Sequence, residues 1–298
     1  MSELIEALKR RASGFTSLFK RSLALQVGVV LLSSIILLAM FGPVIDRYRL
    51  EGHEATDLGY FEKFLPPSLK HPLGTDHFGR DVLGLHITGL KFSLIVGALA
   101  GSVATLISVC IAIIAGYRGG VIDSILNGVT NSVLVIPSLP ILLVVAFYTR
   151  LDLVSMCLTL AAFSWPWSAR VIRAQVLSLK ERTYVDLAKV SGENHFEIMF
   201  SEILPNLIPY IIVGLGFSMI GAIFAETGLR IIGLGPPTVV SLGLLVQQAL
   251  QYGLLTQKRY AEVMSLALLL MSIFISVNLI NKGMEEAFNP RLKKVTGQ

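Results

Sequence analysis

The sequence predicts an all-α protein that crosses a membrane six times. Hydrophobic residues make up 53% of the 298 residues and charged residues only 15%, and the mean hydropathy is +0.70. Soluble domains carry about 25% charged residues, so a water-soluble globule is excluded, and a chain this apolar does not stay disordered. The apolar residues also gather in six runs of roughly the 20 residues that cross a bilayer core of about 30 Å.

Each predicted span is read from one apolar run. The runs cover residues 24–45, 92–116, 124–149, 153–168, 206–225 and 263–281. The first is longer than the apolar part of a cleaved signal peptide, so we expect a retained anchor. Pro137 and Pro140 predict kinks in the third run, and Pro166 interrupts the short fourth run. Gly97 and Gly101 in the second run form a Gly-x-x-x-Gly pair, which favours close helix packing.

The Lys and Arg residues predict the orientation of the chain. Fifteen of the 25 fall in the N-terminal arm, the segment after span four, the C-terminal tail and at Arg118. Such residues are retained on the cytoplasmic side. Placing all fifteen inside requires an even number of spans, so both termini are predicted to be cytoplasmic and the protein to be a multi-pass cell-membrane protein.

This orientation divides the chain into five segments. We expect a cytoplasmic arm at 1–21, a first transmembrane helix at 22–45 and an extracytoplasmic loop with an amphipathic helix at 46–91. A five-helix core with a cytoplasmic loop at 169–205 is expected at 92–282, and a cytoplasmic tail at 283–298. In the outer loop, Thr75 or Asp76 can cap a helix on which Phe78, Val82 and Leu85 share one face.

The spans contain no ionisable side chain as they are bounded here. Ion-driven carriers usually need such groups at mid-membrane, and intramembrane proteolysis needs a nucleophile with a base or paired acids. The chain has no phosphate-binding loop, and the spacing of His71, His77 and His86 matches no metal-ligand pattern. Cys110 and Cys157 lie in apolar runs and are read as small core residues. We therefore expect no catalytic, cofactor or metal site.

Three function classes remain from the residues alone: a passive pore, a structural subunit, and the membrane half of a machine powered elsewhere. Polar residues at helical spacing within the spans either pack between helices or line a solute path. Packing is the favoured interpretation. The candidates for a solute path are Asn127, Asn131, Ser218, Ser265, Ser272 and Ser276.

The cytoplasmic segment 178–205 is the most informative part of the chain. Two short helices are predicted to meet at Gly192, because glycine ends a helix in a left-handed conformation at low cost. Tyr184, Leu187 and Ala188 are expected to share one face before the bend. Such an elbow suits docking to a soluble partner, and the alternative is an amphipathic hairpin lying on lipid. After the bend at Gly192, one face is expected to carry Phe196, Met199 and Phe200.

This segment resembles the cytoplasmic EAA loop of the permeases of ABC importers. Asp186-Leu187-Ala188 stands where the family has Glu-Ala-Ala, Gly192 falls on its glycine, and Leu204-Pro205 on its Leu-Pro. Leu187 replaces the middle alanine, and Glu202 stands where the general pattern has Ile. Neither change alters the spacing of thirteen from Gly192 to Pro205.

Further motifs resemble the oligopeptide/dipeptide branch of that family, and within it the C-type partner. They are His71-Pro72-Leu73-Gly74-Thr75-Asp76-His77-Phe78-Gly79-Arg80-Asp81-Val82-Leu83, then Gly116-Tyr117-Arg118-Gly119-Gly120-Val121-Ile122-Asp123, then residues 226–237, and Asn289-Pro290-Arg291-Leu292 near the end. Arg230-Ile231 differ from the usual Ser-Phe. The resemblance covers about residues 20–294, with the motifs in the family's order.

The resemblance implies a type I importer permease fold of six transmembrane helices. It implies four kinds of partner besides the bilayer: a homologous second permease, two ATP-hydrolysing subunits, an extracytoplasmic solute-binding protein, and a solute such as a peptide or an oligosaccharide. ATP and Mg would be used by the partner ATPases and not by this chain, which is not expected to be an enzyme. The ATPase-coupling loop would comprise Tyr184, Asp186, Leu187, Ala188, Gly192, Glu193, His195, Phe196, Met199, Phe200 and Pro205.

Two other classes remain as alternatives. A stand-alone pore or ion-coupled carrier would move solute without ATP. A membrane enzyme is least favoured, because no polar catalytic set is present.

Overall fold

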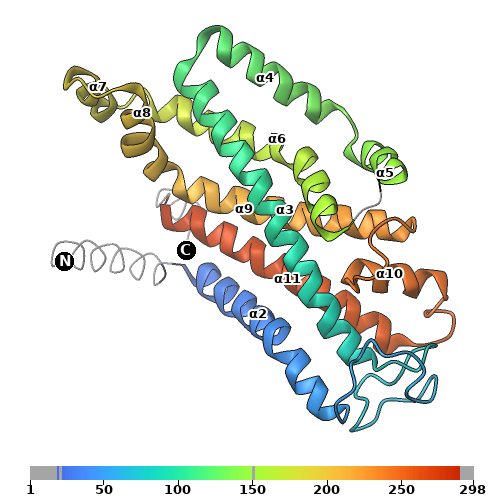
Figure 1. Cartoon of the computed structure of the whole chain (residues 1–298). Coiled ribbons are helices and arrows are strands. Elements are labelled where there is room, and N and C mark those ends of the chain that lie inside the picture. The colour runs from blue at the N-terminus through green and yellow to red at the C-terminus, as the bar shows by residue number, and fades with distance from the viewer. Residues whose placement is uncertain (1–18, 20–21, 150–151, 289–298) are drawn as a thin grey trace.

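The computed structural model describes residue 19 and residues 22–149 and 152–288, and within these ranges the chain is helical (Figure 1). The predicted arm at 1–21 and the last part of the tail, 289–298, lie outside the described residues, apart from Phe19. The described part forms no strand, only an isolated bridge between Thr75 and Asp81. The all-α class is therefore confirmed.

Long apolar helices form the body of the molecule. They are α2 (Leu23–Arg49), α3 (Val82–Arg118), α9 (Leu204–Ile231) and α11 (Tyr260–Phe288). These four regions are long and apolar enough to cross a membrane, and a bent helix pair makes a fifth within the described residues. The multi-pass membrane location is confirmed, whereas the count of six spans and the side of the termini stay predictions.

The bent pair is α4 (Gly120–Val135) and α5 (Ser138–Tyr148), which meet at 83°. The break follows from Pro137, because a proline drives the residue before it out of the helical region, and Ile136 is extended with ψ 123°. Pro140 does not kink the chain. It lies in the first turn of α5, where a missing N–H costs nothing.

The helix α6 (Leu153–Leu179) corrects the predicted fourth span. The expectation of a short segment ending at Ser168 and interrupted by Pro166 was wrong, because the helix continues through the proline to Leu179. Pro166 is buried, and prolines inside membrane helices are tolerated where neighbouring helices pack around them. Ser108 of α3 donates a 2.7 Å hydrogen bond to the carbonyl of Trp165, directly before it.

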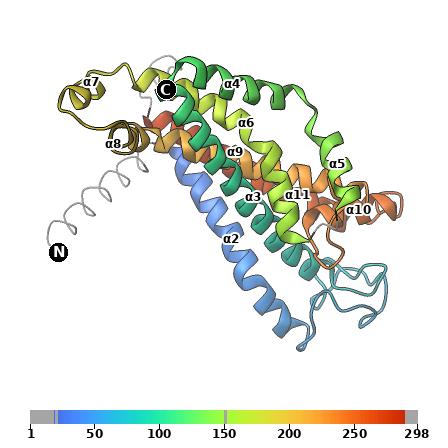
Figure 2. The same ribbon diagram turned by 45° about the horizontal axis from the view of Figure 1, so that its top comes forward.

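The helix α3 is the centre of the packing and contacts both α6 and α9, whereas α2 packs on α11 (Figures 1 and 2). Small residues make the close approaches, as predicted for Gly97 and Gly101. A Cβ on Gly101 would lie 2.7 Å from Cγ of Met219 on α9, and one on Gly97 would lie 2.9 Å from Cδ1 of Ile223.

The outer segment between α2 and α3 is a loop from 50 to 81, so the helix predicted to start at Thr75 or Asp76 was wrong. Both side chains are used within the loop. Thr75 donates to the carbonyl of Glu62, and Asp76 accepts from the backbone N–H groups of Phe78 and Arg80. The helix starts at Val82, and its cap is Asp81, which accepts from Gly84 N–H.

Ionisable residues do occur in the long helices, because these helices extend beyond the apolar runs. His86 and Lys91 lie in the first turns of α3, and Glu226 and Arg230 lie near the end of α9. Glu226 and Arg230 are both buried and pair at 2.9 Å. The spans as bounded from the sequence remain free of such groups, whereas the helices are not.

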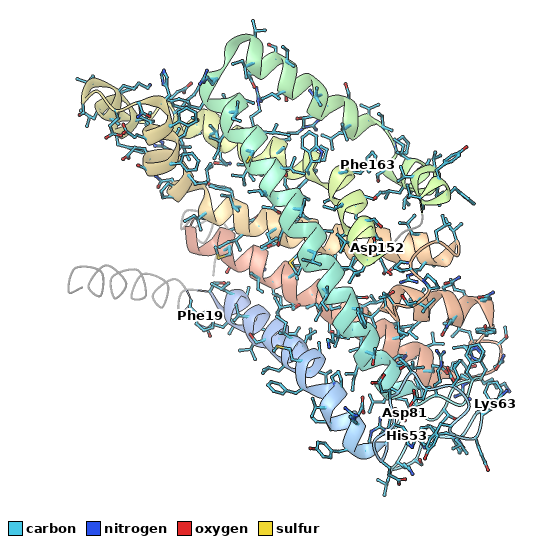
Figure 3. The ribbon with its side chains drawn as sticks, in the orientation of Figure 1. Phe19, His53, Lys63, Asp81, Asp152 and Phe163 are labelled. Atoms are coloured by element: carbon cyan, nitrogen blue, oxygen red, sulfur yellow. The ribbon has the colours of Figure 1, made fainter. Side chains whose placement is uncertain are left out.

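The two ends of the bundle carry different structures (Figures 1 and 2). One end holds the outer loop and α10 (Leu242–Gln251). The opposite end holds α7 (Thr183–Val190), α8 (His195–Glu197) and the π-helix η1 (Ile198–Ile203). Figure 3 shows the side chains along the bundle.

The two cysteines differ in burial. Cys110 is exposed, which corrects its expected place in the core, whereas Cys157 is buried.

Candidate functional site

The candidate site is the elbow, defined here as residues 183–203, which comprise α7, the bend, α8 and η1. The two predicted helices meet at Gly192 as expected. Ser191 caps α7, Gly192 N–H donates to the carbonyl of Lys189, and Glu193 N–H donates to that of Ala188. This pair of bonds is a Schellman motif, which needs a left-handed residue at its centre. Gly192 supplies that residue with φ +84°.

The second arm of the elbow begins with a capping box. The Asn194 side chain accepts from the N–H groups of Phe196 and Glu197, and the Glu197 side chain accepts from Asn194 N–H at 2.8 Å. These bonds satisfy donors that a helix start otherwise leaves free. The sequence around the bend therefore supplies a local stop signal for the first arm and a local start signal for the second.

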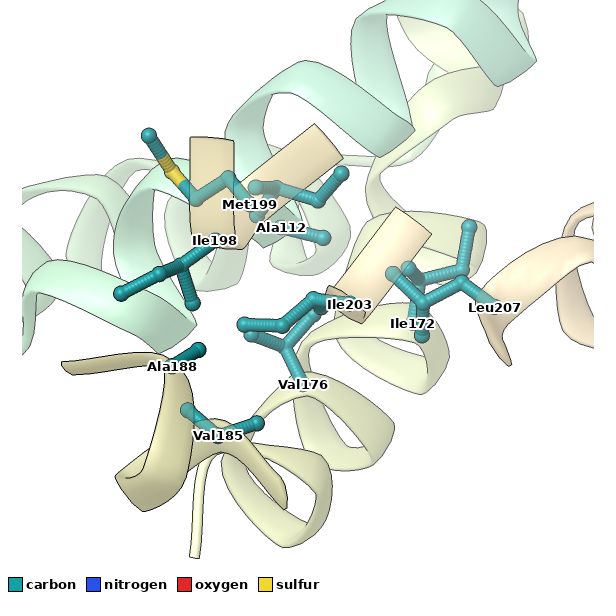
Figure 4. Packing of buried hydrophobic residues seen from close by; sticks show 10 residues of the cluster. Ala112, Ile172, Val176, Val185, Ala188, Ile198, Met199, Ile203 and Leu207 are labelled. Atoms are coloured by element: carbon teal, nitrogen blue, oxygen red, sulfur yellow. The ribbon is translucent and has the colours of Figure 1, made fainter. Parts of the chain in front are cut away.

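The inner side of the elbow is packed onto the bundle (Figure 4). Val185 and Ala188 of α7 and Ile198, Met199 and Ile203 of η1 are buried. They meet residues of α3, α6 and α9 in one apolar cluster. The elbow is thus seated on three of the long helices. The cluster's other buried members are Ala112, Ile113, Ile172, Val176 and Leu207.

The outer side of the elbow is a second apolar surface, which nothing in the described chain covers. Leu187 is 62% exposed, Val190 86%, and Phe196 and Phe200 64% each. We call these four residues the elbow's apolar face. Two expected groupings are thereby corrected: Leu187 points outward whereas Ala188 is buried, and Met199 is buried whereas Phe196 and Phe200 are not. The helical phase places Val185, not Leu187, beside Ala188.

Polar contacts fix the elbow to the bundle. Tyr117 at the end of α3 shares a 3.0 Å hydrogen bond with Nδ1 of His195. Asn206 of α9 lies 3.4 Å from the hydroxyl of Tyr184, and burial together with the Glu202 carboxylate raises the pKa of this phenol. At the tip, Asp186 and Glu193 are exposed, and Asp186 pairs with Lys189 at 2.9 Å.

Pro205 lies in the first turn of α9, directly after the π-helix. Because proline has no backbone N–H, Pro205 donates no hydrogen bond to a carbonyl of the preceding turn. In η1, the Leu204 N–H donates to the carbonyl of Met199, five residues earlier. A π-turn of this kind inside an α-helix often marks a functional segment. The elbow and α9 therefore form one continuous helical connection with a wider turn between them.

The six residues proposed for a solute path do not converge within this chain. Asn131 of α4 accepts a 2.7 Å bond from Arg170, and Asn127 is half-buried on the same helix. Ser218 of α9 is buried and lies 3.3 Å from Ser168. The helices α4 and α11 lie on opposite sides of α3 and α9 (Figure 1), and Ser265, Ser272 and Ser276 all donate to carbonyls of α11 itself.

Two contributors to the elbow were missed from the sequence. Val190 could have been found, since it follows Leu187 by three residues on the same helix face. Tyr117 could not, because its partner His195 lies 78 residues away. Among the described residues, no group of three His, Cys, Asp or Glu side chains is placed to hold a metal ion.

Comparison with known proteins identifies related chains. Residues 108–294 match the family described as binding-protein-dependent transport system inner membrane component. An oligopeptide transport system permease protein OppC of Mycobacterium bovis is 30% identical over 94% of this chain and 95% of its own length. The dipeptide transport system permease protein DppC of Bacillus subtilis is 30% identical over 97% and 90%, and the OppC protein of the same organism is 29% identical over 93% and 88%.

Proposed function

The chain belongs to the family of binding-protein-dependent transport system inner membrane components, and from this we propose that it forms, with a homologous second permease, the path by which an ABC importer moves peptides. Peptides are proposed because the relatives are named for oligopeptide and dipeptide transport. Oligosaccharides are the other solutes considered. The family favours an importer subunit over a stand-alone pore or an ion-coupled carrier.

The importer would contain two ATP-hydrolysing subunits and an extracytoplasmic solute-binding protein in addition to the two permeases. ATP and Mg would be bound by the ATPases. This chain would change conformation while the ATPase subunits hydrolyse ATP, so we propose no catalytic role for it.

The observation that carries the proposal is the elbow's apolar face. Four large apolar side chains stand exposed on a bend held by a Schellman motif, at the end of the bundle away from the outer loop (Figure 2). Exposed aromatic and aliphatic groups of this kind anchor protein interfaces. We propose that this face docks on an ATPase subunit. The other residues proposed for the coupling loop would hold the face in position, and they are Tyr184, Asp186, Glu193, His195 and Pro205.

The elbow's two sides give the proposal its mechanism. The outer side would be moved by the ATPase, and the inner side is packed against α3, α6 and α9. Packed interiors transmit displacement because they have few voids. A shift of the docked face would therefore tilt the long helices as rigid bodies. Packed helices commonly switch between two discrete arrangements by such rigid-body movements.

The test uses the full chain co-expressed with its partner subunits. The double variant Phe196→Ser/Phe200→Ser removes two exposed rings without touching the buried cluster. We expect this variant to insert in the membrane but to co-purify with at least tenfold less ATPase. The reason is that removing one anchor side chain from such an interface costs about 2 kcal/mol of binding free energy. ATP-driven peptide uptake should fall in parallel.

The matched control is Leu58→Ser/Leu69→Ser, which removes two exposed apolar side chains from the outer loop. It should retain the ATPases and the uptake. Equal ATPase retention by both double variants would refute the docking role, and peptide flux through the purified chain alone in vesicles without ATP would refute the importer.

A further inference from the structure

A cleft of about 930 Å³ with both charged and apolar lining residues lies at the outer end of the bundle, and the transport mechanism proposed above makes no use of it. Its volume is in the range of small-molecule sites. Four segments wall it: the end of α2, the loop 51–56, the start of α3 around Thr88 to Phe92, and the loop at Thr238 and Val240. His53 and Asp81 mark this corner of the molecule in Figure 3.

The charges around the cleft leave two cations without a protein partner. Arg47 of α2 and Lys91 of α3 both line it and are exposed, and neither forms an ion pair or a side-chain hydrogen bond with the described residues 19, 22–149 and 152–288. They are therefore free to bind an anion.

Three carboxylates also line the cleft, and two of them are engaged by other cations, whereas Glu54 is exposed and accepts, within the described part of the chain, only a 3.5 Å hydrogen bond from Thr56. Glu51 pairs with Lys70 at 2.8 Å. Asp46 pairs through Oδ1 with Arg49 at 2.7 Å. Its Oδ2 is buried, accepts no hydrogen bond, and would lie 3.2 Å from a Cβ on Gly84, so it faces the interior. Arg47 and Lys91 are thus the two groups of the cleft that are available to an anion.

The depth of the cleft in the membrane identifies the anion. The apolar run of α2 ends at Ile45, and the apolar run of α3 begins directly after Lys91. Both cations therefore lie at the boundary between hydrocarbon and water, where phospholipid phosphates lie. Tyr48, which is 84% exposed, lies at the same level, as aromatic residues do at membrane interfaces.

An apolar surface adjoins the cleft on its membrane side. Phe41, Val44 and Ile45 of α2 are more than half exposed, and Val44 also lines the cleft. Two acyl chains lying along α2 would cover them. The helix α2 packs chiefly against α11 and α3 at the edge of the bundle, apart from α4, α5 and α6 (Figure 1).

We propose that this cleft is a binding site for a diacyl phospholipid of the outer leaflet, whose phosphate diester is held by Arg47 and Lys91. The lipid would join α2, which packs at the edge, to the core helix α3. The cleft would recognise a phosphate, which a free phosphate ion could also supply. The exposed Phe41, Val44 and Ile45 beside it favour the lipid.

The test measures lipid retention by native mass spectrometry on the complete importer, with phosphatidylethanolamine as the probe. The variant is Arg47→Gln/Lys91→Gln, and each single variant is included in case the double variant inserts poorly. The control Lys63→Gln/Lys258→Gln removes two exposed outer cations that do not line the cleft. Diacylglycerol with the same chains and inorganic phosphate complete the set of ligands.

The expected result is lipid retention about fivefold weaker for each cation removed from the cleft, with no change in the control. Diacylglycerol should not be retained and inorganic phosphate should not displace the lipid. Equal retention by the cleft and control variants, or equal retention of diacylglycerol, would overturn the proposal. Displacement by inorganic phosphate at millimolar concentration would overturn the assignment to lipid.

Discussion

The phenol of Tyr117, at the end of α3, lies 3.0 Å from Nδ1 of His195, the first residue of α8. This contact joins the central helix of the bundle to the second arm of the elbow. It is exposed, so its contribution is that of an ordinary hydrogen bond, about 1 kcal/mol. Its position matters more than its strength, because it restrains the arm that carries Phe196 and Phe200.

Tyr117→Phe should loosen the second arm of the elbow without unfolding the protein. We expect hydrogen exchange of the amides at 195–200 to become about fivefold faster, as about 1 kcal/mol implies, with little change in α9. Tyr148→Phe is the control, since Tyr148 is exposed on α5 and its hydroxyl has no partner within the described chain. Unchanged exchange in Tyr117→Phe would show that the bond does not restrain the arm.

Gly192 should be replaceable by asparagine but not by valine. Its φ of +84° is left-handed, and a Cβ there meets nothing within 4 Å, so only backbone strain opposes a side chain. That strain is about 1–2 kcal/mol for most residues and is smaller for asparagine. Uptake and ATPase stimulation should therefore fall for Gly192→Val and remain near normal for Gly192→Asn. An equal loss in both variants would contradict the backbone explanation.

The contact of Gly101 with α9 should tolerate no methyl group. A Cβ at Gly101 would lie 2.9 Å from the backbone nitrogen of Met219, so Gly101→Ala would push two membrane helices apart. We expect a loss of about 1–3 kcal/mol, measured as a lower unfolding temperature in detergent. Gly221→Ala on α9 is the matched control, because a Cβ there has open space. Equal unfolding temperatures would refute the close packing.

Asp81 should be the most stabilising carboxylate of the outer loop. It is fully buried, pairs with Arg49, caps Gly84 N–H and lies 2.8 Å from Nδ1 of His71. Asp81→Asn leaves Arg49 with Asp46 as its carboxylate partner, so the expected cost is that of a lost charged hydrogen bond, about 1.5–3 kcal/mol. Glu51→Gln, which removes an exposed pair with Lys70, should leave the unfolding temperature unchanged. An equal effect of both substitutions would refute the role of burial.

The same carboxylate predicts a pH dependence. Burial alone would raise the pKa of Asp81, but the hydrogen bonds from Arg49, Gly84 N–H and His71 outweigh it and lower the pKa. A lowered pKa stabilises the folded protein at pH values above the ordinary aspartate pKa, and this contribution is lost as the pH falls from that value down through the lowered pKa of the folded state. Stability should therefore decline on acidification more steeply in the wild type than in Asp81→Asn, as measured by unfolding at several pH values. Parallel curves would contradict it.

The sequence was a good guide where one interaction dominated. Apolar runs identified the long helices, Pro137 the break after α4, and Gly192 the elbow, because each depends on the residue and its neighbours. It was a poor guide where distant partners decide. Thr75 and Asp76 have the residue types of a helix cap, yet their side chains bond within the loop 62–80. Pro166 is accommodated by helices that the sequence does not place beside it.

In the candidate site too, some features are set by the local sequence and others by distant parts of the chain. The bend follows from local spacing, whereas the outward direction of Leu187 depends on which face of α7 meets α3 and α6. That choice places Val185 and Ala188 inside. The residues proposed for a solute path lie on α4, α9 and α11; α9 packs on α11, whereas α4 packs on α3 and α6, so the six residues form no single cluster.

The wide turn at Ile198–Ile203 also has an evolutionary consequence. A π-turn is an α-helical segment that has absorbed one additional residue, so deleting a residue there would restore ordinary winding. The same deletion midway along α9 would rotate every later side chain by about 100° and turn Glu226 away from Ser241, to which it is bonded. The wide turn should nevertheless be retained in related chains, because removing its additional residue would shorten the spacing of thirteen from Gly192 to Pro205 that this segment shares with the family.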